Sequence, residues 1–313
     1  MIASIDFTSF GSKLLNLRES LGFTRKDIEY MTGLNKDTIY NIEKGLTVPK
    51  YETLEILSVC YHEDLLDLLS GYRSSSKLIA FERMLEDLIY SASIDDLKII
   101  DHEFENIKKY ISLNNVYYYN NAVEQYELFI LGIKMYNEKN YKQCCTQLEN
   151  ALKITNKNFN LKHWNHSKYS IFELRILLLF SISLSYLNET STSNTIIKYC
   201  METIEEISDN QINVLKFMIT CLYNLSYNYH NIDRHNDALI MAQKGIDFCI
   251  SNNMMYCLPH LFFRKGIALH LLKKDSFLYF LQQGINLFRI TNQETLADLF
   301  IKITKDKYGI ELN

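Results

Sequence analysis

The chain has 313 residues, of which 47% are hydrophobic, and its formal net charge is -4. This composition excludes a disordered chain, and the charge excludes a globally basic nucleic-acid-binding protein, so any contact with nucleic acid has to come from a local surface. Ten glycines and two prolines are too few for a turn-rich sheet protein, so we expect an all-α fold.

The first two predicted helices lie between residues 10 and 33. Apolar residues at helical spacing predict one amphipathic helix, built on Phe10, Leu14, Leu17 and Leu21. Gly22 ends this helix. Thr24, with Asp27 three residues later, predicts the N-cap of a second helix, and Gly33 interrupts the chain after it.

A third helix is predicted after Asn35, a favourable N-cap residue, with Ile39 and Ile42 pointing inward. Gly45 ends it, and Pro49 precedes a fourth helix with the apolar residues Leu54, Ile56 and Leu57. Two short helices joined by a three-residue turn that contains glycine form a helix-turn-helix. The sequence therefore predicts this motif near the N-terminus.

Three segments, LRESLGFTRKDI, GLNKDTIYNIEKG and VPKYETLEILS, resemble the phage-repressor (XRE) type of helix-turn-helix over about the first seventy residues. The resemblance implies a structural pair between Arg18 and Glu43. It also implies DNA contacts, with base edges read in the major groove by Lys36, Asp37, Thr38 and Asn41, and phosphates bound by Lys44 and Lys50. The family usually has glutamine where this chain has Arg25, and we expect that arginine to bind phosphate.

The charge of this segment is a weak signal for DNA binding. From Phe10 to Lys50 the chain has seven Lys and Arg residues against five Asp and Glu residues. Few phosphate contacts per subunit imply modest affinity for a single copy, so we expect a homodimer to bind double-stranded promoter DNA. The alternative is a helix-turn-helix that only contacts protein.

The serine-rich stretch GYRSSSK, Gly71–Lys77, predicts a linker. We therefore expect a DNA-binding domain at 1–71, a linker at 72–77 and a second domain at 78–313. Periodic apolar residues predict a helix pair in Lys77–Leu113.

Residues 131–154 and 225–248 align almost column by column. Small residues recur at the aligned positions Gly132 and Ser226, Cys144 and Ala238, and Ala151 and Gly245. Weaker copies lie at 183–204 and 266–288, and a polar capping helix is predicted near the C-terminus. These copies resemble degenerate tetratricopeptide repeats, which implies a right-handed superhelix of helix pairs with a concave inner face.

A phage-repressor helix-turn-helix followed by such repeats resembles the Rgg/PlcR/PrgX (RRNPP) class of peptide-pheromone receptors of Gram-positive bacteria. The resemblance implies a cytoplasmic homodimer that binds promoter DNA and is switched by a short signalling peptide in quorum sensing. The alternative is a repressor or scaffold whose repeats bind a protein partner. A groove with deep pockets and convergent amides favours the peptide, whereas a flat or acidic groove favours the protein.

The helix predicted at Val214–Tyr229 has an apolar stripe and a second face that carries tyrosines and amides. In the next repeat Arg264 occupies the place that Asn224 holds here. Following the family, we expect Asn224 and Asn228 to hold a peptide backbone and Arg264 to bind a carboxylate, while the side-chain pockets are walled by Tyr223, Tyr227 and His260. The alternative is that both asparagines are solvated or cap neighbouring helices.

Enzymatic and membrane functions have no support in the sequence. It contains no glycine-rich phosphate loop, no GxSxG and no HExxH motif, so we expect no catalytic residue, no metal and no cofactor. The seven cysteines are odd in number and lack a CxxC, which is typical of reduced core residues in a cytosolic protein. The longest apolar run, Ile176–Leu187, is too short to span a bilayer.

Overall fold

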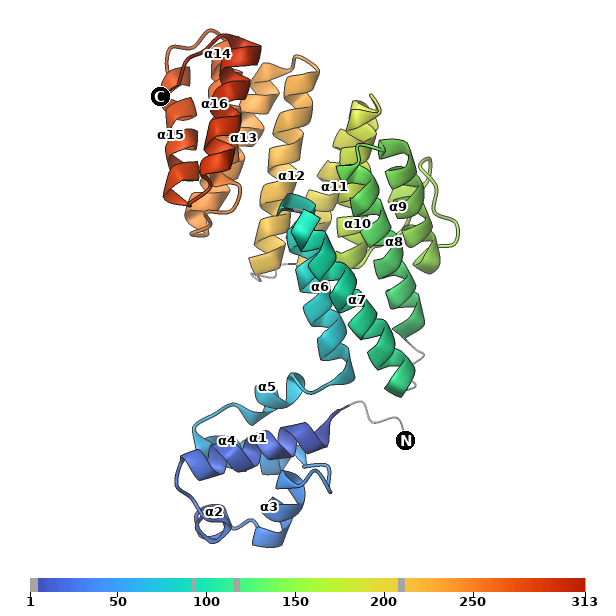
Figure 1. Cartoon of the computed structure of the whole chain (residues 1–313), viewed down its shortest axis with the longest axis vertical. Coiled ribbons are helices and arrows are strands. Elements are labelled where there is room, and N and C mark those ends of the chain that lie inside the picture. Colours follow the sequence, from blue (N-terminus) through green and yellow to red (C-terminus); the bar gives the residue numbers. More distant parts are fainter. Residues whose placement is uncertain (1–4, 92–93, 115–118, 208–211, 313) are drawn as a thin grey trace. The chain divides into compact units, whose positions relative to one another are not determined.

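The computed structural model describes residues 5–91, 94–114, 119–207 and 212–312, and within these ranges the regular structure is helical (Figure 1). The prediction of an all-α protein is therefore confirmed. The chain divides into two compact units, one with α1–α7 apart from the end of α6, and the other with α8–α16. None of the described helices combines the length and the hydropathy needed to cross a membrane.

Five helices form the N-terminal domain, and the N-caps of the second and third are those that the sequence predicts. The Thr24 hydroxyl accepts a hydrogen bond from the Asp27 backbone, and the Asp27 carboxylate accepts one from the Thr24 backbone. Asn35 accepts from the backbone of Asp37 at 2.7 Å. The helices are α1 Phe7–Ser20, α2 Arg25–Thr32, α3 Lys36–Glu43, α4 Tyr51–Tyr61 and α5 Leu65–Ser70.

The core of this domain contains the two predicted isoleucines of α3, since Ile39 is 1% and Ile42 is 3% exposed. Leu54 and Leu57 of α4 are buried beside them, but Ile56 is 40% exposed. Ile56 lies outside this core, because it points about 100° away from Leu57 around the helix axis.

The predicted linker is more ordered than its composition suggests. α6 begins at Ser74, so Ser74–Lys77 lie inside a helix. Ahead of it, the Tyr72 carbonyl accepts a hydrogen bond from the Asp6 backbone at 2.9 Å, and the Tyr72 ring packs edge-on against Phe10 at 5.6 Å. Serines are as favourable at a helix start as in a loop, and here they stand at the start of α6.

Two longer helices, α6 Ser74–Ser91 and α7 Ile94–Asn114, follow the N-terminal domain. The rings of Phe81 and Phe104 stack at 5.7 Å, and Leu78, Ile100 and Ile107 are buried. The helix pair predicted in Lys77–Leu113 is therefore confirmed.

The second unit is built from consecutive antiparallel helices that pack in chain order (Figure 1). In the turn between the two helices of a pair, one residue has a left-handed backbone. The N–H of the next residue donates to the carbonyl five residues earlier, as in a Schellman motif. These residues are Lys139, Asn188, Asp233 and Lys273, and Asn253 and Asn292 have the same backbone in the turns that follow a pair. The helices are α8 Asn120–Asn137, α9 Tyr141–Thr155, α10 Ile171–Tyr186, α11 Thr190–Ile207, α12 Ile212–Asn231, α13 His235–Ser251, α14 Leu258–Leu271, α15 Phe277–Ile290 and α16 Glu294–Tyr308.

Small residues stand where helices of this unit approach each other closely. A Cβ added to Gly132 would lie 2.6 Å from the Leu148 side chain, and the buried Ser226 hydroxyl donates to the Ala238 carbonyl at 2.9 Å. Both contacts lie within aligned copies of the repeat. The predicted helix pairs and the C-terminal capping helix, α16, are confirmed.

Candidate DNA interface and ligand site

The side chains expected to read DNA lie on the side of α3 that faces away from the core. Lys36, Asp37 and Thr38 are exposed and Asn41 is half-buried, while Ile39 and Ile42 fill the interior. The two lysines expected to bind phosphate, Lys44 and Lys50, are exposed at the end of α3 and the start of α4. The arrangement leaves these side chains available to a DNA groove and its flanking phosphates.

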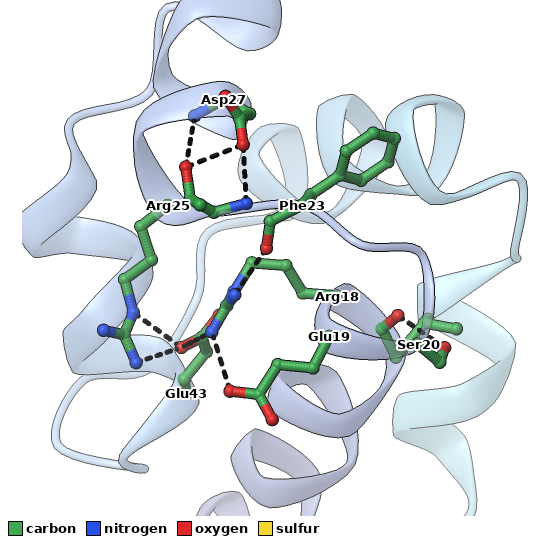
Figure 2. Close-up of polar contacts among 9 residues, drawn as sticks. Arg18, Glu19, Ser20, Phe23, Arg25, Asp27 and Glu43 are labelled. Carbon is green, nitrogen blue, oxygen red and sulfur yellow. Dashed lines mark hydrogen bonds and ion pairs between the residues drawn. The ribbon is translucent and has the colours of Figure 1, made fainter.

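A buried ion pair fixes α3 to α1, as the resemblance implied (Figure 2). Glu43 has a side chain only 1% exposed, and its Oε1 accepts from the Arg18 Nε at 2.6 Å. A second Arg18 nitrogen donates to the Phe23 carbonyl at 2.6 Å. Its hydrogen bond to Glu43 raises the pKa of Arg18, so the charge persists despite burial.

The guanidinium of Arg25, expected to bind phosphate, is already paired with a carboxylate. Its Nε donates to the Glu43 Oε2 at 2.8 Å (Figure 2). Its guanidinium carbon lies 5.0 Å from the centre of the Tyr40 ring. Arginine at this position has both the charge and the length to reach a buried carboxylate, which the family's glutamine lacks. The phosphate contact expected of Arg25 therefore competes with a structural role.

Tyr40 is a surface residue of α3 that sequence reasoning missed. It is 42% exposed, and Arg25 supports one face of its ring. Its position could have indicated a surface role, because Tyr40 lies between Ile39 and Asn41, at the edge of the exposed side of the helix. An aromatic ring held there is placed to contact the same groove.

We predict that Asn41→Ala weakens binding to a cognate operator by about 1 to 3 kcal/mol and leaves binding to random DNA nearly unchanged, because a side chain that reads bases loses specific contacts only. Lys44→Ala is the matched comparison. If Lys44 binds phosphate as expected, the substitution weakens both complexes alike, and the slope of log affinity against log salt concentration falls by about one. Fluorescence anisotropy with an operator selected from a random duplex library measures both. Equal losses on the two duplexes for Asn41→Ala would exclude base reading.

In the repeat unit, α12 carries the predicted apolar stripe. Ile219, Leu222 and Leu225 are buried, and Tyr223, Asn224 and Tyr227 are half-buried on another part of its surface. The Asn224 amide nitrogen donates to the Thr220 carbonyl of its own helix at 2.9 Å, which leaves its oxygen without a hydrogen-bond donor among the described residues.

The expectation that Asn228 holds a peptide backbone needs correction. Asn228 is 2% exposed, and its amide nitrogen donates to the Ser193 hydroxyl and to the Asn194 side-chain oxygen, each at 2.9 Å. Both hydrogens are thus used to tie α12 to α11. Asn228 connects neighbouring helices through side-chain contacts, a role that neither the peptide reading nor its alternative named.

Arg264 of α14 lies against the tyrosines of α12. Its guanidinium carbon is 4.4 Å from the centre of the Tyr227 ring and 5.5 Å from that of Tyr223, and one terminal nitrogen is 3.4 Å from the Tyr223 hydroxyl. The Arg264 Nε is buried and has no hydrogen-bond partner among the described residues. No carboxylate forms an ion pair with this guanidinium in the part of the chain that the structure describes.

His260 lies one helical turn before Arg264, packed among rings. Its imidazole centroid is 4.8 Å from that of Phe288 and 5.4 Å from that of Phe300, and its buried Nδ1 has no hydrogen-bond partner within the ranges that the structure describes. Burial, together with the Arg264 charge, lowers the pKa of His260 to about 4, so the ring is neutral at pH 7. The structure thus places Tyr223, Tyr227, Arg264 and His260 together, with Asn224 on the same helix as the tyrosines.

No group of three or more His, Cys, Asp or Glu side chains with a metal-binding arrangement occurs among the described residues.

Comparisons with known proteins agree with this architecture. A family described as a helix-turn-helix domain matches residues 11–73. No curated protein sequence matches the chain. The structure of PlcR from Bacillus thuringiensis in complex with the peptide PapR7 and DNA has 15% identity, covers 94% of this chain and 99% of PlcR, and gives a TM-score of 0.68. Apo PlcR has 14% identity, covers 94% of this chain and 98% of PlcR, and gives a TM-score of 0.57. The chain therefore carries an N-terminal helix-turn-helix domain and has the superhelical repeat fold of PlcR.

Proposed function

We propose that this protein is a cytoplasmic transcription regulator that binds promoter DNA as a homodimer and is controlled by a short linear peptide bound beside α12 and α14. In this proposal α3 reads the operator and the repeats receive the signal. The chain needs no catalytic residue for either task. The observation that carries the proposal is Arg264, a cation whose buried Nε has no hydrogen-bond partner in the described part of the chain.

A buried polar atom without a partner costs free energy, roughly 1 to 3 kcal/mol, and the cost is higher for charged groups. Folded proteins therefore rarely keep one without a reason. Tyr223 and Tyr227 support the guanidinium through their ring faces, but a ring face does not satisfy an N–H as a carboxylate does. A ligand carboxylate would supply the missing acceptors, and arginine binds a carboxylate with two parallel hydrogen bonds.

The peptide is favoured over a protein partner by the kind of groups that gather at this place. Asn224 offers a free amide oxygen to a backbone N–H, and Tyr223 and Tyr227 offer half-buried ring surface to side chains. The PlcR structure whose fold this chain shares contains a peptide and DNA, which supports the same pairing of functions here. A protein partner would instead call for a broader exposed surface.

We predict that Arg264→Gln weakens binding of the cognate peptide by about 10- to 100-fold, because it removes a charge-assisted pair from a desolvated site. The test begins with mass spectrometry of peptides that co-purify with the full-length protein from its native host, followed by calorimetry with the peptide identified. Lys274→Gln is the control, since Lys274 is exposed in the turn between α14 and α15.

A peptide should co-purify with the wild type and with Lys274→Gln and be depleted from Arg264→Gln. Asn224→Ala should weaken binding of the same peptide by about 1 to 3 kcal/mol and leave the helical content of the protein unchanged. If only a folded protein co-purifies, the scaffold alternative holds. Unchanged peptide affinity in both variants would place the ligand on another face of the repeats.

A further inference from the structure

A polar pocket that does not include Arg264 lies between α11 and the end of α12. It has a volume of about 370 Å³. Side chains of α11 at spacings of three and four residues form one wall, so they share one face of that helix: Thr190, Ser191, Asn194, Thr195 and Lys198. Tyr229 and Arg234 stand in the opposite wall.

Two cations approach the same tyrosine ring in this pocket. The Lys198 ammonium lies 5.9 Å and the Arg234 guanidinium carbon 4.8 Å from the centre of the Tyr229 ring. The Arg234 Nε donates a hydrogen bond to Asp237 at 2.8 Å, which leaves the two terminal nitrogens of the guanidinium available to a ligand. Lys198 has no ion pair among the described residues. None of the described residues that line the pocket is acidic. The pocket wall therefore carries one cation without an ion pair among the described residues, Lys198, and a second, Arg234, that is paired with Asp237.

Asn194 adds a donor that has no partner. It is 8% exposed, and its side-chain oxygen accepts from Asn228 at 2.9 Å, which orients the amide. Its Nδ2 bonds to no described residue, and the residue lines the pocket. A nine-tenths buried amide whose oxygen is already used offers only N–H donors to a ligand.

We propose that this pocket binds a compact oxyanion, a phosphate or a carboxylate group, through Lys198, Arg234 and the Asn194 amide. The groups that converge here are the Lys198 ammonium, the terminal nitrogens of the Arg234 guanidinium, the Asn194 amide N–H and hydroxyls. All of them can donate to oxygen, and the two cations supply the opposite charge. The first turn of α11 adds the positive end of a helix dipole. The site is separate from Arg264, so it does not depend on the peptide.

Asn194→Asp gives the sharpest test of this site. The substitution keeps the oxygen that accepts from Asn228 and replaces the free N–H donor with a negative oxygen, so it should repel an anion while preserving the contact between α11 and α12. Lys198→Gln, at an exposed position, removes one cation and leaves the fold intact. Lys216→Gln is the control, because Lys216 lies 5.7 Å from the Tyr256 ring in a similar geometry elsewhere.

The measurement is calorimetric titration of the full-length protein with inorganic phosphate and, separately, with acetate, in a buffer without other oxyanions. We expect saturable binding of at least one of them, weakened about tenfold or more by Asn194→Asp and by Lys198→Gln and unchanged by Lys216→Gln. A higher affinity for phosphate than for acetate identifies a phosphate group as the ligand, and a higher affinity for acetate identifies a carboxylate. Absence of saturable binding of both anions, or equal binding by all variants, would overturn the proposal.

Discussion

Replacing Glu43 with glutamine is expected to lower the free energy of unfolding of the N-terminal domain by about 3 to 5 kcal/mol. The Glu43 side chain is 1% exposed and that of Arg18 is 6% exposed, so the substitution leaves a buried guanidinium without its counter-charge. The second arginine held by the same carboxylate, Arg25, loses its partner as well (Figure 2). Because α3 is attached to α1 through this pair, DNA binding should fall along with stability.

Arg25→Gln is the matched control for Glu43→Gln. The Arg25 side chain is 33% exposed, so water replaces much of the lost contact and the cost should stay near 1 kcal/mol or below. Chemical denaturation followed by circular dichroism measures both variants. A similar small loss in the two would show that the buried pair contributes no more than a surface ion pair.

Replacing Gly11 with alanine is expected to destabilise the same domain by about 3 kcal/mol, the upper end of the usual cost of overpacking. A Cβ at this position would lie 2.4 Å from the Ile42 carbonyl oxygen and 2.6 Å from that of Glu43. These are backbone atoms of α3, which cannot rotate away as a side chain can. The added methyl group therefore has to push α3 away from α1.

The sign of this effect is diagnostic, because helix propensity alone favours alanine over glycine by roughly 1 kcal/mol. Ser12→Ala supplies the control at the next position of α1, which is exposed, and its effect should remain within about 0.5 kcal/mol. Thermal denaturation and operator binding should both worsen for Gly11→Ala. A stabilised Gly11→Ala variant would mean that the two helices separate at no cost.

Local sequence signals identified most of the N-terminal domain. Thr24 with Asp27, Asn35, Gly33 and Gly45 act within a few residues of themselves, so their roles follow from cap and turn chemistry alone. The repeat boundaries were harder to place. Their turns use left-handed Lys, Asn and Asp residues where glycine is the usual signal, and only the alignment of small residues revealed the period.

The sequence by itself determined the helices, the helix-turn-helix and the repeat pattern, because caps, glycines and apolar spacing act over one or two helical turns. The tertiary structure decided which polar side chains are free. Asn224 and Asn228 stand one turn apart with the same chemistry, yet α11 supplies partners to Asn228 alone, and Arg25 turns inward because Glu43 lies within its reach. Such choices depend on which atoms other helices bring close, and spacing along one helix carries no information about them.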